Sequence, residues 1–172
     1  MTTLTTHRIT ARPLTDEAFA PFGAVLRATP DGAPFSEREA LLDLSRGTPR
    51  FYVMDLVDKP PAFTGITRHR AVTQTLAAVG GKPWLLAVAP PYDVDVPDAT
   101  PRLEDIVAFQ IPGDVAVLLH RGTWHSGPFF TGERMSFFNL ELADTNQVDH
   151  HTYRLDRDLG IRCEVVVPDS EA

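Results

Sequence analysis

The chain has 172 residues, of which 43% are hydrophobic and 23% are charged, and its formal net charge is −7 at pH 7. This length and composition predict one globular domain spanning residues 1–172. The acidic balance argues against a nucleic-acid partner, which needs a basic face, but a small anionic substrate is still compatible with a locally cationic pocket.

The cysteine content and the apolar runs bear on the compartment. Cys163 is the single cysteine, so the chain has no internal disulfide framework, as is usual in a reducing cytoplasm. No apolar run approaches the roughly 18 residues of a membrane span, and the first eight residues lack the apolar core of a signal peptide. The sequence therefore predicts a soluble, cytoplasmic protein with no membrane partner.

Two short helices are predicted near the N-terminus. Thr15 is a suitable N-cap for a helix over Thr15–Phe19, because its hydroxyl can accept a hydrogen bond from the first turn. Ser36 and Glu39 have the spacing of a capping box for a second helix over Ser36–Leu42.

Most of the chain consists of short apolar or alternating runs. Its fifteen prolines and eleven glycines break up long helices. The predicted strands, in chain order, are Ile9–Leu14, Ala24–Ala28, Arg50–Val57, Phe63–His69, Thr73–Ala78, Trp84–Ala89, Val107–Ile111, Val115–Leu119, Met135–Leu142 and Glu164–Val167. The Pro- and Asp-rich stretch Pro90–Pro101 is predicted to be a surface loop. Many short strands with few helices predict an all-β barrel or sandwich.

The segment Ile111–His125 is the most informative stretch. A Pro-Gly-Asp turn precedes a buried strand, and His120 and His125 then flank a tight turn at Gly122. The segment resembles the second motif of cupin β-barrels, with His120 where a proline often stands and His125 at the motif histidine. Ser126-Gly127-Pro128 is predicted to end the segment with a turn.

A second histidine, His69, resembles the first cupin motif in a degraded form. That motif has an HxH pair followed by a glutamate, and here Thr67 and Gln74 occupy the positions of the first histidine and the glutamate. His69, Gln74 and His125 would make a weak metal set, because an amide oxygen is a poor ligand for the metals that imidazole prefers. A structural role for His69 stays open beside a functional one.

Acid–base chemistry and carboxylate binding are the functions that these residues suit. His120 and His125 can exchange protons near neutral pH, and the planar fork of Arg68 can bind a carboxylate. Alternation along a strand raises a conflict, because an inward His69 would turn Arg68 and Arg70 away together.

For several other side chains, the sequence is compatible with two different roles. Trp124 is either core filler or a platform for a ligand. Asn139 and Glu141 share one face of the strand Met135–Leu142 and are either outside residues or pocket residues, since burying them requires partners. The cluster at residues 149–151 invites a metal reading, but neighbouring side chains in a strand point in opposite directions.

Three segments, in order and over most of the chain, resemble the ureidoglycolate lyase family, formerly called ureidoglycolate hydrolase. They read ITARPLTDEAFAPFGAVL (Ile9–Leu26), RHRAVTQTL (Arg68–Leu76) and LHRGTWHSGPFF (Leu119–Phe130). The chain departs from the family pattern after Gln74, at Ser126, and in the segment Asn139–His151.

The resemblance implies a cupin-like (jelly-roll) β-barrel with a few short helices, a homodimer, and an enzyme late in allantoin and purine breakdown. Its reaction splits ureidoglycolate into glyoxylate and urea, and some members carry a divalent ion such as nickel. On this resemblance, the catalytic residues are expected to be His69, His120, His125 and Glu141, and the substrate-binding residues Arg68, Gln74, Trp124 and Asn139.

Two other functions compete with this interpretation. A metal-dependent cupin isomerase or dioxygenase would require tightly bound metal, which the missing glutamate and first histidine of the first motif disfavour. A non-catalytic binder of small acids would be stabilised by its ligand without turnover.

Overall fold

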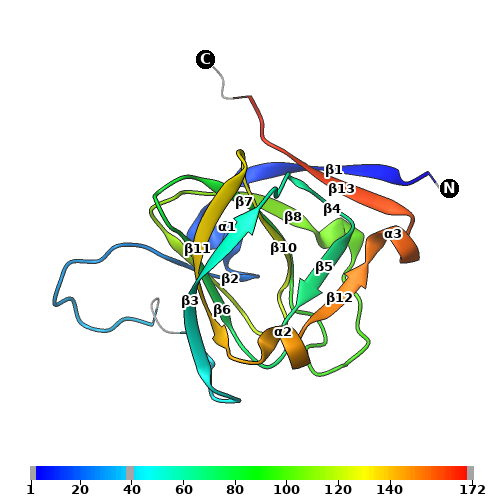
Figure 1. Cartoon of the computed structure of the whole chain (residues 1–172). Helices are drawn as coiled ribbons and strands as arrows, with labels where there is room; N and C mark the ends of the chain where they lie inside the picture. The colour runs from blue at the N-terminus through cyan, green and yellow to red at the C-terminus, as the bar shows by residue number, and fades with distance from the viewer. Residues whose placement is uncertain (1–2, 38–40, 170–172) are drawn as a thin grey trace.

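The computed structural model describes residues 3–37 and 41–169, and two curled β-sheets dominate it (Figure 1). The larger sheet has the order β12-β5-β10-β7-β8-β1-β13-β4, and the smaller has the order β2-β9-β6-β11-β3. The strands of the larger sheet are β1 (Thr5–Pro13), β4 (Ala62–Phe63), β5 (Gly65–Arg68), β7 (Trp84–Ala89), β8 (Val107–Ile111), β10 (Trp124–Phe129), β12 (His151–Arg154) and β13 (Ile161–Val166). Those of the smaller sheet are β2 (Gly23–Leu26), β3 (Pro49–Val57), β6 (Gln74–Ala78), β9 (Ala116–Leu119) and β11 (Arg134–Leu142).

Helical structure is limited to single turns. These are α1 (Asp16–Phe19), the 3₁₀ turn η1 (Leu103–Asp105), α2 (Thr145–Val148) and α3 (Leu155–Asp158). No helix in the described ranges is long and apolar enough to cross a membrane. Two curled sheets around a common interior, with a few short helices, confirm the predicted all-β, cupin-like barrel.

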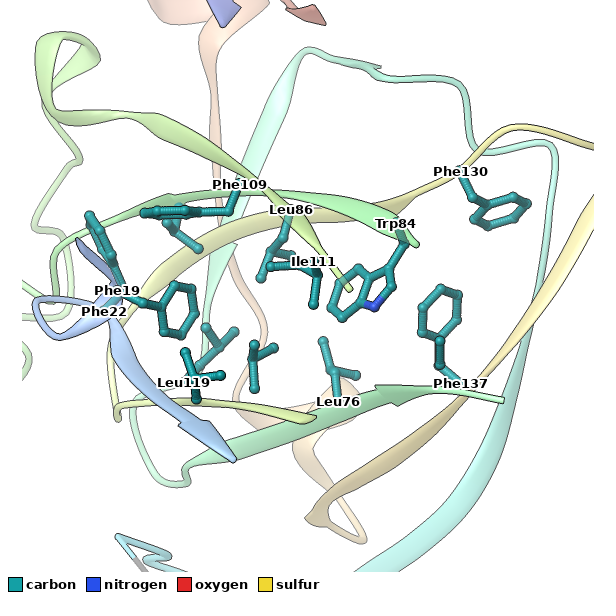
Figure 2. Close-up of a cluster of buried hydrophobic side chains, with 14 of the residues drawn as sticks. Phe19, Phe22, Leu76, Trp84, Leu86, Phe109, Ile111, Leu119, Phe130 and Phe137 are labelled. Carbon is teal, nitrogen blue, oxygen red and sulfur yellow. The ribbon is translucent and has the colours of Figure 1, made fainter. Parts of the chain in front are cut away.

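The main core fills the space between the two sheets at one end of the barrel (Figure 2). Leu76 and Phe137 reach it from the smaller sheet, while Trp84 and Phe109 reach it from the larger one. The Trp84 and Phe137 rings meet edge to face with their centroids 5.1 Å apart. Each fully buried apolar side chain contributes about 1.5–3 kcal/mol to folding, so this core contributes strongly to the stability of the barrel.

A second core lies on the other face of the larger sheet. Strand β7 is buried at all six positions, so it contributes to both cores: Leu86 and Val88 to the first, Leu85 and Ala87 to the second. Trp124 of β10 belongs to the second core. Because side chains alternate along a strand, its neighbour His125 is directed to the barrel interior.

Most element predictions are confirmed, and the exceptions have local causes. Thr15 caps α1 and accepts a hydrogen bond from the Ala18 backbone N–H at 3.1 Å. The predicted strand Phe63–His69 is divided into β4 and β5. The capping box at Ser36 and Glu39 extends over residues 38–40, which lie outside the described residues.

The turn predicted at Ser126-Gly127-Pro128 is wrong. Strand β10 continues to Phe129, and its register against β7 shifts between Ser126 and Phe129. Gly127 has a φ of 116°, a conformation that side-chain-bearing residues rarely adopt, and Pro128 has no N–H to donate. The Gly-Pro pair therefore forms an irregularity inside a strand rather than its end. The short elements β12, α2 and α3 were not predicted either.

Candidate active site

A cavity of about 150 Å³ lies in the barrel interior next to the main core, with which it shares Leu76. It is lined by Tyr52, Met54, Leu56, Lys59, His69, Gln74, Leu76, His125, Gly127, Pro128, Asn139, Glu141, Asn146 and His150. These residues come from both sheets and from the segment around α2. The cavity thus brings together five of the sequence-predicted site residues, namely His69, Gln74, His125, Asn139 and Glu141.

Three imidazole rings form one wall of the cavity. The His69 ring centroid lies 5.0 Å from that of His125 and 5.6 Å from that of His150. His69 follows the end of β5, His125 lies on β10, and His150 precedes β12. The Gly122 backbone N–H donates to the His69 carbonyl at 2.6 Å, which joins the turn before β10 to the end of β5.

Hydrogen bonds to backbone carbonyls fix the tautomers of two of these rings. The Nδ1 atom of His69 lies 2.6 Å from the Asp149 carbonyl oxygen, and that of His125 lies 3.1 Å from the Thr123 carbonyl oxygen. A carbonyl can only accept, so Nδ1 is the protonated nitrogen in each neutral ring. The Nε2 atoms are therefore left as proton acceptors.

Burial keeps these two imidazoles neutral. Desolvation lowers the pKa of His125 to about 3, and repulsion from a charged His69 adds to the effect. Burial also lowers the pKa of His69, against the opposing effects of the Asp149 carbonyl and carboxylate. Both rings are consequently unprotonated bases at neutral pH.

A polar cluster faces the imidazoles across the cavity. Glu141 is 1% exposed, and its carboxylate accepts hydrogen bonds from Gln74 at 3.1 Å, Asn139 at 3.2 Å and the Tyr52 hydroxyl at 3.2 Å. A guanidinium nitrogen of Arg50 lies 4.0 Å from the same carboxylate. Asn139 and Glu141 are therefore pocket residues of β11 rather than outside residues, and both have hydrogen-bond partners.

The amide oxygen of Gln74 is buried and has no hydrogen-bond partner among the described residues. Its orientation is fixed, because the amide NH₂ must face the acceptor-only Glu141 carboxylate. An unpaired buried acceptor costs about 1–3 kcal/mol.

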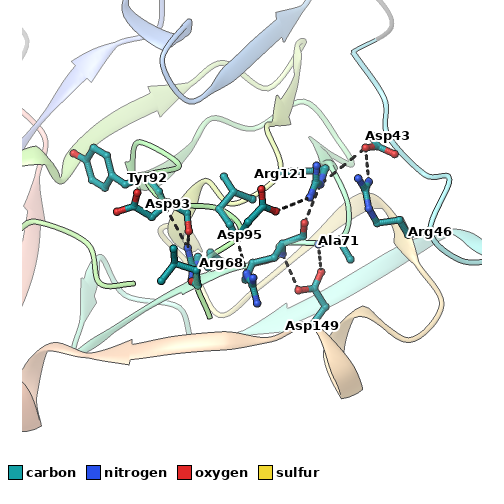
Figure 3. Close-up of polar contacts among 12 residues, drawn as sticks. Asp43, Arg46, Arg68, Ala71, Tyr92, Asp93, Asp95, Arg121 and Asp149 are labelled. Carbon is teal, nitrogen blue, oxygen red and sulfur yellow. Dashed lines mark hydrogen bonds and ion pairs between the residues drawn. The ribbon is translucent and has the colours of Figure 1, made fainter. Parts of the chain in front are cut away.

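Arg68 does not line the cavity. It is fully buried on the other face of the larger sheet, where its guanidinium donates to His151 Nδ1 at 3.0 Å and to the Val96 carbonyl at 2.6 Å. It also donates to the Tyr92 and Asp93 carbonyls, both at 3.3 Å (Figure 3). Arg70 similarly donates to the Val94 carbonyl at 2.5 Å. Both arginines face away from His69, as alternation predicts, and they bind the loop that follows β7.

Two further expected site residues also lie outside the cavity lining. Trp124 is fully buried in the second core, where its ring lies under the Arg68 guanidinium at 4.8 Å and beside His151 at 5.1 Å. His120 is partly buried, and its backbone N–H donates to the Phe22 carbonyl at 2.9 Å. His120 is therefore absent from the cavity lining, although it flanks the same turn as His125.

Four polar lining residues were not predicted as site residues, namely Tyr52, Lys59, Asn146 and His150, although His150 belongs to the 149–151 cluster that was considered for metal binding. The alternation of β3 was the available signal for Tyr52, because residues 52, 54 and 56 share one face of the strand. The neighbouring residues His150 and His151 point in opposite directions, as predicted: His150 lines the cavity, and His151 contacts Arg68. No local pattern indicated Lys59 or Asn146.

The Asp149 carboxylate has a structural role, which argues against its service as a metal ligand. Its carboxylate accepts from the backbone N–H groups of Arg70 at 2.7 Å and Ala71 at 2.8 Å (Figure 3). Within residues 3–37 and 41–169, no group of three or more His, Cys, Asp or Glu side chains is arranged to hold a metal ion. The set of His69, Gln74 and His125 offers two imidazoles and one amide oxygen, a donor set that does not fit a tightly held divalent metal.

Comparison with known proteins gives a consistent result. A family model described as ureidoglycolate lyase matches residues 6–161. A ureidoglycolate lyase from Pseudomonas fluorescens is 28% identical over 166 residues, covering 88% of this chain and 95% of that protein. One from Stutzerimonas stutzeri is 27% identical and covers 88% of this chain and 93% of that protein.

Among solved structures, an oxalate decarboxylase matches 64% of this chain and 25% of its own, with 12% identity and a TM-score of 0.39. That likeness is too weak to carry an argument. The ureidoglycolate lyase family model covers His69, His125 and the rest of the cavity lining. The chain belongs to the ureidoglycolate lyase family.

Proposed function

We propose that this protein is a ureidoglycolate lyase, an enzyme that splits ureidoglycolate into glyoxylate and urea during the breakdown of allantoin. The single observation that carries the proposal is the pair of neutral imidazoles at His69 and His125, whose Nε2 atoms are free to accept a proton beside a polar pocket. Membership of the family supports the choice of substrate.

The reaction is the collapse of a carbinolamine, and it requires only proton transfers. One Nε2 atom removes the proton of the substrate hydroxyl, and the oxygen electrons form the carbonyl of glyoxylate. The C–N bond breaks, and its electron pair goes to the departing urea nitrogen, which receives a proton. The proton lost from oxygen balances the proton gained by nitrogen, so the enzyme returns to its starting state.

The low pKa of His125 suits the second half of this sequence. An imidazole whose pKa is near 3 gives up a proton readily once it has accepted one, so it is a strong acid toward the leaving nitrogen. Both rings start neutral, so the proton that the urea nitrogen receives is the one removed from the substrate hydroxyl, and we assign its transfer to His125 and His69 together. Each group contributes about 10²- to 10⁴-fold to the rate.

The polar cluster is assigned to the ureido group. Gln74, Asn139 and Glu141 line this part of the cavity, and Asn139 and Glu141 orient the Gln74 amide. Arg68, Trp124 and His120 keep a supporting role outside the cavity in this scheme. No step is assigned to a metal ion, because the donor set does not fit one.

The proposal includes a cytoplasmic homodimer. The outer faces of β3 and β11 expose apolar side chains, with Phe51 68% exposed and stacked on Phe138 at 5.7 Å. Val53 lies beside them and is 54% exposed. A face of this kind is typical of a subunit contact. Sedimentation of the wild-type protein and of Phe51→Asp tests this part, with a wild-type monomer as the contradicting result.

The activity is tested with purified protein and racemic ureidoglycolate, with and without a chelator. Release of urea and glyoxylate in equal amounts under both conditions supports the proposed lyase. Product formed only without chelator would require a metal and overturn the proposed chemistry. Ligand-induced stabilisation without any product would favour the alternative of a small-acid-binding protein.

A further inference from the structure

Lys59 has the one permanent positive charge among the described residues that line the cavity. We propose that Lys59 determines specificity for a carboxylate substrate by binding that carboxylate. This inference rests on the proposed function, because it assigns the substrate's charged end to a particular side chain. It also replaces the role that the sequence suggested for Arg68.

The charges of the cavity are separated along β3. Arg50 pairs with Glu141 at the start of this strand, and Val57, two residues before Lys59, pairs with Arg134 at its end. With a strand rise of about 3.3 Å per residue, the positions of Tyr52 and Leu56 are about 13 Å apart. Glu141 and Lys59 therefore lie at opposite ends of the cavity wall that β3 forms.

The lining between these ends is apolar. Met54 and Leu56 of β3 and Leu76 of β6 lie between the Glu141 cluster and Lys59. An anionic substrate is repelled by Glu141 and attracted by Lys59, so only one orientation is favourable. Its carboxylate lies toward Lys59, and its ureido group lies toward Gln74.

The nearby arginines are already engaged. The Arg50 guanidinium stacks on the Tyr52 ring at 3.6 Å and lies next to Glu141. Arg68 and Arg70 are bound to backbone carbonyls of the loop after β7. In the described part of the chain, no hydrogen bond or ion pair involves the Lys59 side chain, whose backbone carbonyl accepts from the Phe130 N–H at 3.1 Å.

Lys59 also stands where a substrate would enter. A neighbouring hollow of about 350 Å³ shares Lys59 and Gly127 with the cavity. Asp58 lines this hollow but not the cavity, so its carboxylate does not compete inside. A lysine suits this place, because its flexible stem can follow an anion from the hollow into the cavity.

The test compares Lys59→Met with Lys82→Met, which removes the chain's other lysine; both lysines are exposed and both precede a proline, but only Lys59 lines the cavity. Calorimetry measures the Kd of glyoxylate, and steady-state kinetics measure KM and kcat for ureidoglycolate. Lys59→Met is expected to raise the Kd and the KM by about 10- to 100-fold, the value of one charged hydrogen bond, with a smaller effect on kcat. Lys82→Met should match the wild type, and Lys59→Arg should recover part of the affinity.

Several outcomes would overturn the inference. Unchanged Kd and KM in Lys59→Met would do so, as would a loss of affinity in Arg50→Met but not in Lys59→Met. The two proposals fail separately: a wild-type protein that binds glyoxylate through Lys59 but releases no urea would contradict only the lyase activity. A protein that neither binds glyoxylate nor turns over ureidoglycolate would contradict both.

Discussion

The backbone carbonyl of Asp149 lies 2.6 Å from Nδ1 of His69, while the Asp149 carboxylate accepts from the two backbone N–H groups that follow His69. One residue therefore holds both the ring and the backbone of the imidazole that faces the cavity. The contact joins the end of β5 to the segment between α2 and β12, elements about eighty residues apart in sequence.

Asp149→Ala tests this arrangement. The variant leaves the N–H groups of Arg70 and Ala71 without acceptors, so we expect the free energy of unfolding to fall by about 1–3 kcal/mol. Alanine keeps the backbone carbonyl that accepts from Nδ1 of His69, so nitrogen NMR of the imidazole should still show the Nδ1-protonated tautomer. Asp144→Ala is the control, because the Asp144 side chain is exposed and makes no capping hydrogen bond. Equal stability of the two variants would contradict the assigned role.

Arg68→Met separates a structural role from substrate binding. Its guanidinium is fully buried and holds backbone carbonyls of residues 92–97. Losing these bonds should reduce the free energy of unfolding by about 2–5 kcal/mol. The KM for ureidoglycolate should stay within about twofold of the wild type, because Arg68 does not line the cavity and its loss removes no contact with the substrate. Arg157→Met, at an exposed position, is the matched control. A large rise in KM without loss of stability would restore Arg68 as the carboxylate ligand.

Stability should depend on pH through His125. Its pKa is about 3 in the folded protein, whereas an unfolded histidine titrates near 6.5. Below pH 6.5 the unfolded chain therefore binds a proton that the folded chain does not, and the free energy of unfolding falls by up to about 1.4 kcal/mol per pH unit until pH 3. Above pH 6.5 this contribution is constant.

Denaturant titrations of wild type and His125→Gln at several pH values measure the effect. The variant should show a shallower decline between pH 6.5 and pH 3, and the two curves should run parallel above pH 6.5. Identical slopes over the whole range would contradict a neutral, buried His125. The wild-type kcat/KM should likewise show no loss centred near pH 6.5 that is due to protonation of His125.

The sequence predicted the barrel well because its strands are short, apolar and bounded by strong turn residues. Strand β7 is the clearest case, since six consecutive buried residues follow Pro83 and precede Pro90. Prediction failed for β10, whose Gly-Pro pair resembles a turn but is a register shift within the sheet. That distinction depends on the partner strand, which a local pattern cannot reveal.

For the site, alternation was a better guide than motif likeness. It placed Arg68 and Arg70 opposite an inward His69, and the structure has them in that arrangement. The expected role of Arg68 came from its chemistry alone and did not survive this geometry. Lys59 was missed because it enters the cavity from a loop between strands, where no periodicity exists.

The most direct test of the cavity chemistry compares His125→Gln with His120→Gln. Both changes remove one imidazole from the same motif, but only His125 lines the cavity. We predict that His125→Gln lowers kcat for urea release by about 10²- to 10⁴-fold while the protein stays folded, and that His120→Gln stays within about threefold of the wild type. Normal turnover by folded His125→Gln, or an equal loss in both variants, would contradict the account.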